Sequence, residues 1–186
     1  MILYIKNMVS LRCKLCVKDE LRRLRIGFLK IELGSVNLTK NITADKQQHL
    51  KERLAKSGLE LIEDKKSILI EKIKGVIIEM VHFTEDMPKT NYSDYISKKL
   101  GYDYTYLSNL FTAAKGIDIQ HYIIHHKIER VKELLQYKEL NLTEISYMLH
   151  YSSVSHLSNQ FKKVTGISPS VYNLRNQNRT WNLENI

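Results

Sequence analysis

The sequence predicts a small α+β domain followed by an all-α domain of two helix-turn-helix units joined by a long helix. Three observations predict this division: residues 1–66 switch between strand-like and helical hydrophobic periods, a polar segment at residues 83–91 interrupts the pattern, and the second half contains an internal repeat. The expected parts are the α+β domain, a connecting helix and linker at residues 67–91, the all-α domain at residues 92–175 and a tail at residues 176–186.

Strand and helix patterns alternate in the first domain. A strand is expected at residues 2–8 and a helix at residues 13–25. Residues 28–38 alternate with period two around a turn, which predicts two strands, and a helix at residues 45–56 and a strand at residues 59–62 follow. This order is that of the ferredoxin-like fold, in which two helices cover one face of a four-stranded sheet.

A further helix is expected at residues 67–82, where apolar residues form a stripe along one side. The stripe consists of Ile70, Ile73, Ile77 and Met80. We interpret it as core or interdomain packing, with homodimerisation as the alternative.

The internal repeat has a period of about 50 residues. Four residues recur 49 positions later and seven recur 50 positions later, which is far beyond chance. The first copies are Ile96, Ser97, Leu100, Tyr102, Leu107, Ser108, Asn109, Phe111, Gly116, Ile117 and Tyr122.

Each repeat is expected to form a short helix, a tight turn and a second helix that ends at a glycine. In the first unit the short helix covers residues 93–100, Gly101 makes the turn and Asp103 caps the next helix. A long amphipathic helix at residues 119–137 joins this unit to the second one.

The second unit has a short helix at residues 143–149 and a turn at His150 and Tyr151. Its second helix is capped by Ser152 or Ser153 and ends near residue 165. Four apolar residues of the second helices should face inward and form the two cores; they are Leu107, Phe111, Leu157 and Phe161.

The composition indicates a polyanionic partner. The net charge is +9 and the pI is near 9.4, with the basic excess in residues 1–82 (+7) rather than in residues 83–186 (+2). No apolar window approaches the ~18 residues of a membrane span, so we expect a cytoplasmic protein without membrane contact. Two cysteines give no disulfide framework.

Three segments of the second half resemble the DNA-binding domain of AraC-type transcription regulators. The most specific is HLSNQFKKVTGISPSVY at residues 156–172; IERVKELL at residues 128–135 resembles the linker helix of that family, and LTEISYMLHYSS at residues 142–153 its second helix-turn-helix. The resemblance covers about residues 84–175. This chain has His150 where the family usually has glycine, a position at which a positive φ is expected.

The resemblance implies which side chains contact DNA, because the second helix of a helix-turn-helix enters the major groove. Asparagine can pair with adenine, serine with several base edges, and valine with a thymine methyl group. The expected base contacts are Thr105, Ser108 and Asn109 in the first unit, and Val154, Ser155, His156 and Asn159 in the second. The expected phosphate contacts are Lys127, Arg130, Lys162 and Lys163.

The first domain resembles, more distantly, the heavy-metal-associated module of copper chaperones, which carries Met-x-Cys-x-x-Cys in its first loop. Met8 matches the methionine and Cys13 the second cysteine, but Ser10 stands where the first cysteine belongs. Cys16 forms C-x-x-C with Cys13 inside the helix. A metal or redox role for this pair is the less favoured interpretation, and ordinary helix packing is the favoured one.

The sequence therefore predicts a sequence-specific double-stranded-DNA-binding transcription regulator without enzymatic activity or cofactor. RNA polymerase and a second copy of the chain are further candidate partners. The alternative is a metal- or redox-responsive regulator that senses a soft cation through Cys13 and Cys16. A metal chaperone or an enzyme would need a ligand pair or catalytic constellation that the sequence does not show, and His121 with His125 lacks a third ligand.

Overall fold

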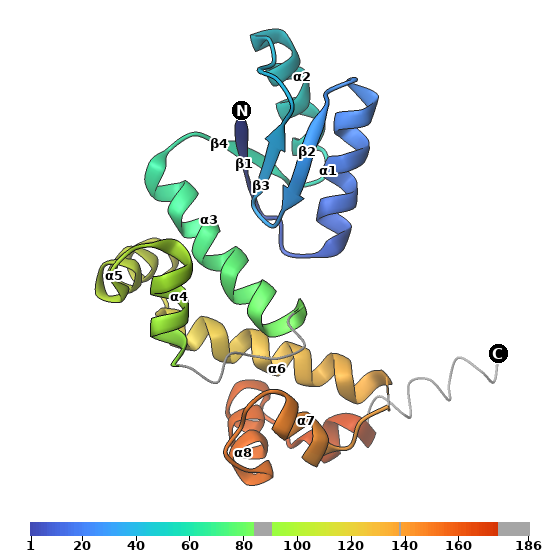
Figure 1. Ribbon diagram of the computed structural model, residues 1–186. Coiled ribbons are helices and arrows are strands. Elements are labelled where there is room, and N and C mark those ends of the chain that lie inside the picture. The colour runs from blue at the N-terminus through green and yellow to red at the C-terminus, as the bar shows by residue number, and fades with distance from the viewer. Residues whose placement is uncertain (84–90, 138, 175–186) are drawn as a thin grey trace, which may run out of the picture. The chain divides into compact units, whose positions relative to one another are not determined.

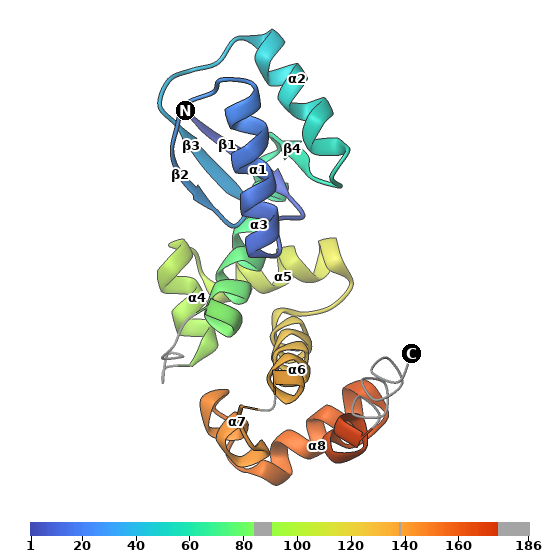
Figure 2. The same ribbon diagram turned by 90° about the vertical axis from the view of Figure 1, so that its right-hand side faces the viewer.

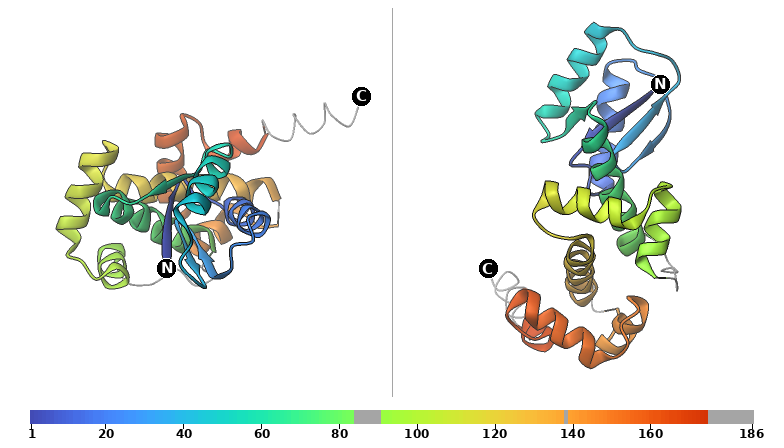
Figure 3. Two further views of the ribbon diagram at one scale, coloured as in Figure 1. Left: turned by 90° about the horizontal axis from the view of Figure 1, so that it is seen from above. Right: turned by 90° about the vertical axis from the view of Figure 1, so that its left-hand side faces the viewer.

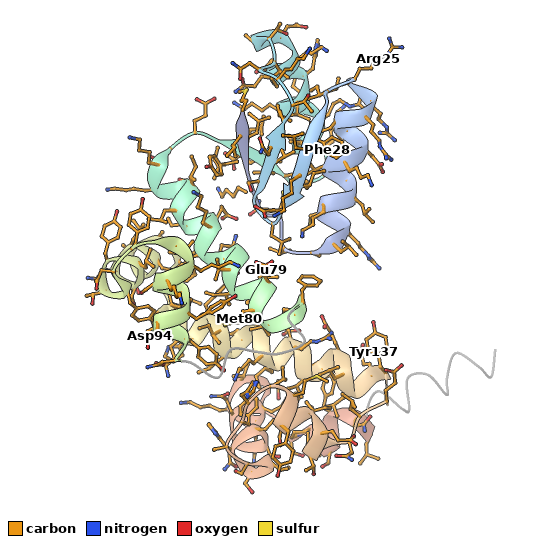
Figure 4. All side chains as sticks on the ribbon, in the orientation of Figure 1. Arg25, Phe28, Glu79, Met80, Asp94 and Tyr137 are labelled. Atoms are coloured by element: carbon orange, nitrogen blue, oxygen red, sulfur yellow. The ribbon has the colours of Figure 1, made fainter. Side chains whose placement is uncertain are left out.

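The computed structural model describes residues 1–83, 91–137 and 139–174 (Figure 1). The described chain forms two compact units. The first comprises Met1–Glu79 and Ser93–Gly116, and the second comprises the described parts of Met80–Tyr92 and Ile117–Ile186. The division falls between Glu79 and Met80, which are labelled in Figure 4. The domain boundaries expected from the sequence lie at other residues than the limits of these two units. They stay a prediction.

The first unit contains a four-stranded antiparallel sheet. Its strands are β1 (Ile2–Lys6), β2 (Phe28–Glu32), β3 (Ser35–Leu38) and β4 (Glu60–Ile62), in the spatial order β2-β3-β1-β4. The strand expected at residues 2–8 ends at Lys6, because Asn7 has a φ of 69° and leaves the extended conformation.

Helices α1 (Leu11–Arg23) and α2 (Ala44–Ala55) lie on one face of this sheet (Figure 2). Helix α1 begins two residues before the expected position 13, because the Ser10 hydroxyl accepts a hydrogen bond from the backbone N–H of Cys13 and caps the helix. We call residues 1–62 the N-terminal module. Its core includes the fully buried side chains of Ile5, Val17, Leu21, Leu50 and Leu54.

Helix α3 (Lys65–Ile78) follows the module and continues as a π-helical turn, η1 (Glu79–Phe83). Asp64 caps its start by accepting a hydrogen bond of 2.8 Å from the Ser67 backbone. Within the first unit, α3 passes between the sheet and helices α4 and α5 (Figure 3, right). Its apolar stripe is buried within the chain, since Ile73 and Ile77 have no exposed area, which confirms the packing interpretation of these residues.

Five helices with full bounds follow, and residues 169–174 are also helical. The five are α4 (Tyr92–Leu100), α5 (Tyr104–Lys115), α6 (Ile119–Tyr137), α7 (Leu142–Met148) and α8 (Val154–Thr165). All five agree with the helices expected from the repeat to within one residue at most ends. Most of the linker expected at residues 83–91 and the whole tail expected at residues 176–186 lie outside the described residues.

Candidate nucleic-acid interface

The first helix pair, α4 and α5, belongs to the first unit. Gly101 turns the chain with a φ of 74°, and the Asp103 carboxylate caps α5 by accepting a hydrogen bond of 3.1 Å from the Tyr106 backbone. Helix α5 ends at Gly116, which adopts the left-handed conformation. Both ends of α5 thus carry the residue types that favour helix ends, an aspartate at the N-cap and a glycine at the C-cap.

The second pair, α7 and α8, is built in the same way. Asn141 and Glu144 form a reciprocal capping box at the start of α7. His150 occupies the turn with a φ of 51°, as expected from its place in the repeat, and Ser153 caps α8 by accepting a hydrogen bond of 3.0 Å from the His156 backbone. Of the two candidate caps, Ser153 is the one used.

Helices α5 and α8 bury and expose the same positions. From residue 104 to 113 and from residue 154 to 163, each position is buried, half-buried or exposed in both helices alike. The inward positions are Leu107, Phe111, Leu157 and Phe161, all without exposed area, as predicted. The sequence repeat is thus accompanied by a repeat in burial, and α5 and α8 expose equivalent positions to solvent.

The residues predicted to contact bases lie on or beside these outward faces. Ser108 and Val154 are half-buried; the exposed members are Thr105, Asn109, Ser155, His156 and Asn159. The Asn109 and Asn159 side chains make no hydrogen bond within the described part of the chain, so their amides are available to an external partner.

Two aromatic contacts distinguish the outward faces. In the first pair the Tyr102 and Tyr106 rings stack with centroids 5.8 Å apart, and both are about half exposed. In the second pair His156 accepts or donates a hydrogen bond of 2.9 Å with the Ser152 hydroxyl through Nδ1 and lies edge-on to Tyr151. The His156 ring is therefore held in place by its neighbours, with Nε2 as the atom left for a base or phosphate.

Of the four predicted phosphate contacts, Lys162 and Lys163 are exposed on α8. Arg130 is half-buried, and its guanidinium donates a hydrogen bond of 2.9 Å to Glu133. Lys162, Lys163 and Arg130 keep their proposed role. Lys127 does not, because the structure buries it.

Lys127 has only 5% of its surface exposed. Its ammonium donates a hydrogen bond of 2.6 Å to the Leu149 carbonyl and lies over the rings of Tyr92 (5.0 Å) and Tyr151 (4.7 Å). Burial lowers the pKa of this ammonium to about 8. Lys127 thus holds the end of α7 against α6 inside the second unit, and its position in the helix, four residues from both Ile123 and Val131, was the sequence signal for burial.

The cysteines lie where the sequence placed them, in the first turns of α1, and both are half-buried. Burial raises the pKa of the Cys13 thiol, but hydrogen bonds with the Ser10 hydroxyl and with backbone groups outweigh it, so that the pKa lies below its ordinary value. The Ser10 oxygen lies 3.4 Å from the Cys13 sulfur. A hydroxyl and a thiol do not make the two-thiolate set that a soft metal ion prefers.

Metal ligation is not supported elsewhere in the described residues, where no group of three or more His, Cys, Asp or Glu side chains is arranged to hold an ion. His121 is instead paired with Asp118 at 2.9 Å. None of the helices described here is both long and apolar enough to cross a membrane.

Residues 96–175 match a family model described as a helix-turn-helix domain. This part of the chain is similar to helix-turn-helix domains. An HTH-type transcriptional regulator of Staphylococcus aureus (strain MSSA476) is 30% identical over 92 residues, which are 50% of this chain and 12% of that protein. The chain thus spans about an eighth of the length of this relative.

Two solved structures share the fold of this part of the chain. The C-terminal domain of AraT, a response regulator from Geobacillus stearothermophilus, is 26% identical with a TM-score of 0.50, over 60% of this chain and 88% of that chain. The DNA-binding domain of AdpA, solved in complex with a target DNA, has a TM-score of 0.50 at 14% identity, over 60% of this chain and 94% of that chain. The second likeness concerns the fold alone.

Proposed function

We propose that the protein is a sequence-specific double-stranded-DNA-binding transcription regulator that inserts two recognition helices, α5 and α8, into successive major grooves. The observation that carries this proposal is the matched pair of outward faces on α5 and α8, above identical buried anchors, within an AraC-type domain. Each face offers an asparagine amide that has no partner among the described residues, at the same place in the repeat. Asparagine amides suit adenine edges, so thymine- and adenine-containing elements are the expected target.

Three cations supply the sequence-independent part of the proposed binding. Lys162 and Lys163 extend from α8 into solvent, and Arg130 lies half-buried on α6. Contacts of this kind position a protein on the duplex and make its affinity depend on salt.

Affinity selection of genomic DNA fragments tests the proposal. The purified full-length protein is incubated with the fragments near physiological salt, and the bound fragments are sequenced. Enrichment of one motif with two half-elements about one helical turn apart, bound at about 10⁻⁸ M or tighter, is the expected result. Equal recovery of all fragments would contradict sequence-specific binding by this chain.

We propose further that the N-terminal module is ferredoxin-like and a degenerate relative of the heavy-metal-associated domain. The strand order β2-β3-β1-β4 with two helices on one face supports the first part, and the Met8, Ser10 and Cys13 positions support the second. According to this proposal, the module has kept the fold of the heavy-metal-associated domain. It has lost the first metal-binding cysteine, which is replaced by Ser10.

The alternative function is a regulator that senses a soft cation or an oxidant through Cys13 and Cys16. The lowered pKa of Cys13 favours thiolate chemistry and is the observation in its support. Stoichiometric Cu(I) or Zn(II) binding that disappears in the Cys13→Ser variant would establish it. Absence of binding would leave the module as a docking or positioning element.

RNA polymerase and a second copy of the chain are the further partners that we propose from the family resemblance. Sedimentation of the protein with and without its selected DNA would show whether two copies bind together. Pull-down with purified RNA polymerase tests the other partner.

A further inference from the structure

Helix α3 contacts the N-terminal module very closely at two glycines. A Cβ atom on Gly75 would lie 3.0 Å from the Leu33 carbonyl oxygen, at the turn between β2 and β3. The next residue of that turn, Gly34, has a φ of 84° and faces the backbone of Glu71. The absence of a side chain at Gly75 therefore allows α3 to rest directly on the hairpin turn.

A buried ion pair within α3 lies beside the same contact. Glu71 and Lys74 are 5% and 7% exposed, and the Lys74 ammonium donates hydrogen bonds of 2.8 and 2.9 Å to the two Glu71 oxygens. Glu71 also accepts a hydrogen bond of 3.2 Å from the backbone N–H of Asn7, the residue after β1. Because Glu71 and Lys74 both lie on α3, the bond from Asn7 is the one that joins this helix to the β1–α1 loop, and Lys74 holds the Glu71 carboxylate in place to accept it. A shift of α3 would take the Asn7 bond away from a buried carboxylate.

Helix α5 belongs to the same compact unit as the module and α3. Burial lowers the pKa of Lys115, at the C-terminal end of α5, and the positive charges of Lys74 and Lys6 lower it further while Glu71 opposes them. The end of α5 is thus within electrostatic reach of Lys74 and of Glu71, the residue that joins α3 to the module. One helix, α3, packs against the sheet and against α5 (Figure 3).

We propose that the N-terminal module is the positioning element of the first recognition helix, with Gly75 and the Glu71–Lys74 pair as the positioning residues that act through α3. Changes at this contact alter base reading by α5 and leave base reading by α8 unchanged. This inference rests on the proposed DNA-binding function, which it refines by assigning the module to one of the two recognition helices.

The Gly75→Ala variant of the full-length protein provides the first test. Alanine raises the helix propensity of α3, so any impairment comes from the displaced contact with Leu33 and not from a weakened helix. The discrimination against base substitutions in the half-element read by α5 should fall roughly tenfold, while that in the α8 half-element stays at the wild-type level. The two half-elements are assigned beforehand with the Asn109→Ala and Asn159→Ala variants.

Gly27→Ala is the matched control. Its Cβ would meet only the side chain of Thr39, which is exposed and can rotate, at the end of β2 opposite to the turn that contacts α3. The control adds the same methyl group to the module without displacing α3, so both half-elements should be read as in the wild type.

A second variant replaces the ion pair as a whole. In the Glu71→Met, Lys74→Met double variant no unpaired charge is left buried, so the fold should persist, but the acceptor of the Asn7 hydrogen bond is removed. The same selective loss at the α5 half-element is expected. An unchanged α5 half-element in both variants, or an equal loss at both half-elements, overturns the proposal.

Amide hydrogen exchange separates this proposal from the DNA-binding function. If the wild type recognised no DNA sequence, the proposed function would fail, but faster exchange of the α5 amides in both variants and unchanged exchange in α8 would still support the positioning role. Unchanged exchange in α5 would then overturn it.

Discussion

The Lys127 ammonium donates a hydrogen bond of 2.6 Å to the Leu149 carbonyl, which ties helix α6 to the turn that precedes recognition helix α8. The carbonyl belongs to Leu149, the C-cap residue that follows α7, where intrahelical partners run out. A buried cation therefore satisfies a backbone group at the centre of the second helix pair.

This contact predicts a pH-dependent stability. The folded chain releases the Lys127 proton near pH 8, whereas an unfolded chain holds a lysine proton until about pH 10.4. The unfolded state binds more protons between these values, so the free energy of unfolding should rise there, by up to about 1.4 kcal/mol per pH unit. Burial raises the pKa of Tyr151 and so gives the opposite trend once tyrosines of the unfolded chain ionise, near pH 10.

Urea denaturation of the wild type and of Lys127→Met at pH 7.5, 8.5 and 9.5 checks this. The difference between the two proteins cancels the titration of the cysteines, which both contain. If the free energies of unfolding of the two proteins changed equally with pH over this range, the lowered pKa of Lys127 would be wrong.

The core of the second recognition helix should be sensitive to truncation. Phe161 has no exposed area and packs edge-on against Tyr172, with ring centroids 5.5 Å apart. Phe161→Ala should lower the free energy of unfolding by about 3–5 kcal/mol. Phe83 is 52% exposed, so Phe83→Ala should change it by less than about 1 kcal/mol, and comparable losses in the two variants would show that the burial of Phe161 is misassigned.

The asparagine at the centre of each outward face should read a base. On the selected DNA site, Asn159→Ala should weaken binding by about 1–3 kcal/mol and remove the preference at one base pair, since its amide no longer pairs with an adenine edge. Fluorescence anisotropy with each of the four base pairs at that position measures both effects. Gln120→Ala, an exposed amide at the start of α6, serves as control. If Asn159→Ala weakened binding equally for all four base pairs and kept the base preference, Asn159 would contact the DNA backbone and not a base.

The exposed lysines of α8 should act on phosphates. Replacing Lys162 and Lys163 by Gln should lower the slope of log K against log salt by about 0.9 for each contact and weaken binding similarly for specific and unrelated DNA. Lys51→Gln with Lys56→Gln removes the same charge from the N-terminal module. An equal reduction of the slope in this control would point to net charge rather than to contacts made by α8.

Restoring the missing thiol should restore soft-metal binding. In Ser10→Cys the new sulfur would occupy the position of the Ser10 oxygen, 3.4 Å from the Cys13 sulfur, and complete the Met-x-Cys-x-x-Cys pattern. Competition with a Cu(I) indicator should show one tightly bound ion per chain, and Ser10→Ala should show none. If Ser10→Cys did not bind Cu(I), the proposed relationship between the module and the heavy-metal-associated domain would be contradicted.

Local residue chemistry allowed much of the fold to be predicted. Asp103, Ser153, Gly116 and Gly166 define the ends of α5 and α8 through caps that depend on neighbouring residues only. The spacing of Phe111 and Phe161 in the repeat also identified the buried anchors, because equivalent positions in equivalent helices meet equivalent surroundings.

The predictions failed where the burial of a charged residue depends on tertiary packing. Lys127 was expected at a phosphate, but Leu149 and Tyr151 bury it, and only its register with Ile123 and Val131 signalled this. The burial of Glu71 and Lys74 was not predicted, because no pattern in the sequence indicates that this helix is covered on nearly every side. Such burial depends on tertiary packing, which helical periodicity does not encode.

The most direct test of two-helix reading is the affinity of the full-length protein for its selected DNA site when one half-element at a time is replaced by unrelated sequence. Two recognition helices predict that either replacement lowers the affinity at least roughly a hundredfold toward the non-specific level, and that both together lower it no further than that level. If one of the half-elements could be replaced without loss, base reading would reside in a single recognition helix, and the account of paired reading by α5 and α8 would be wrong.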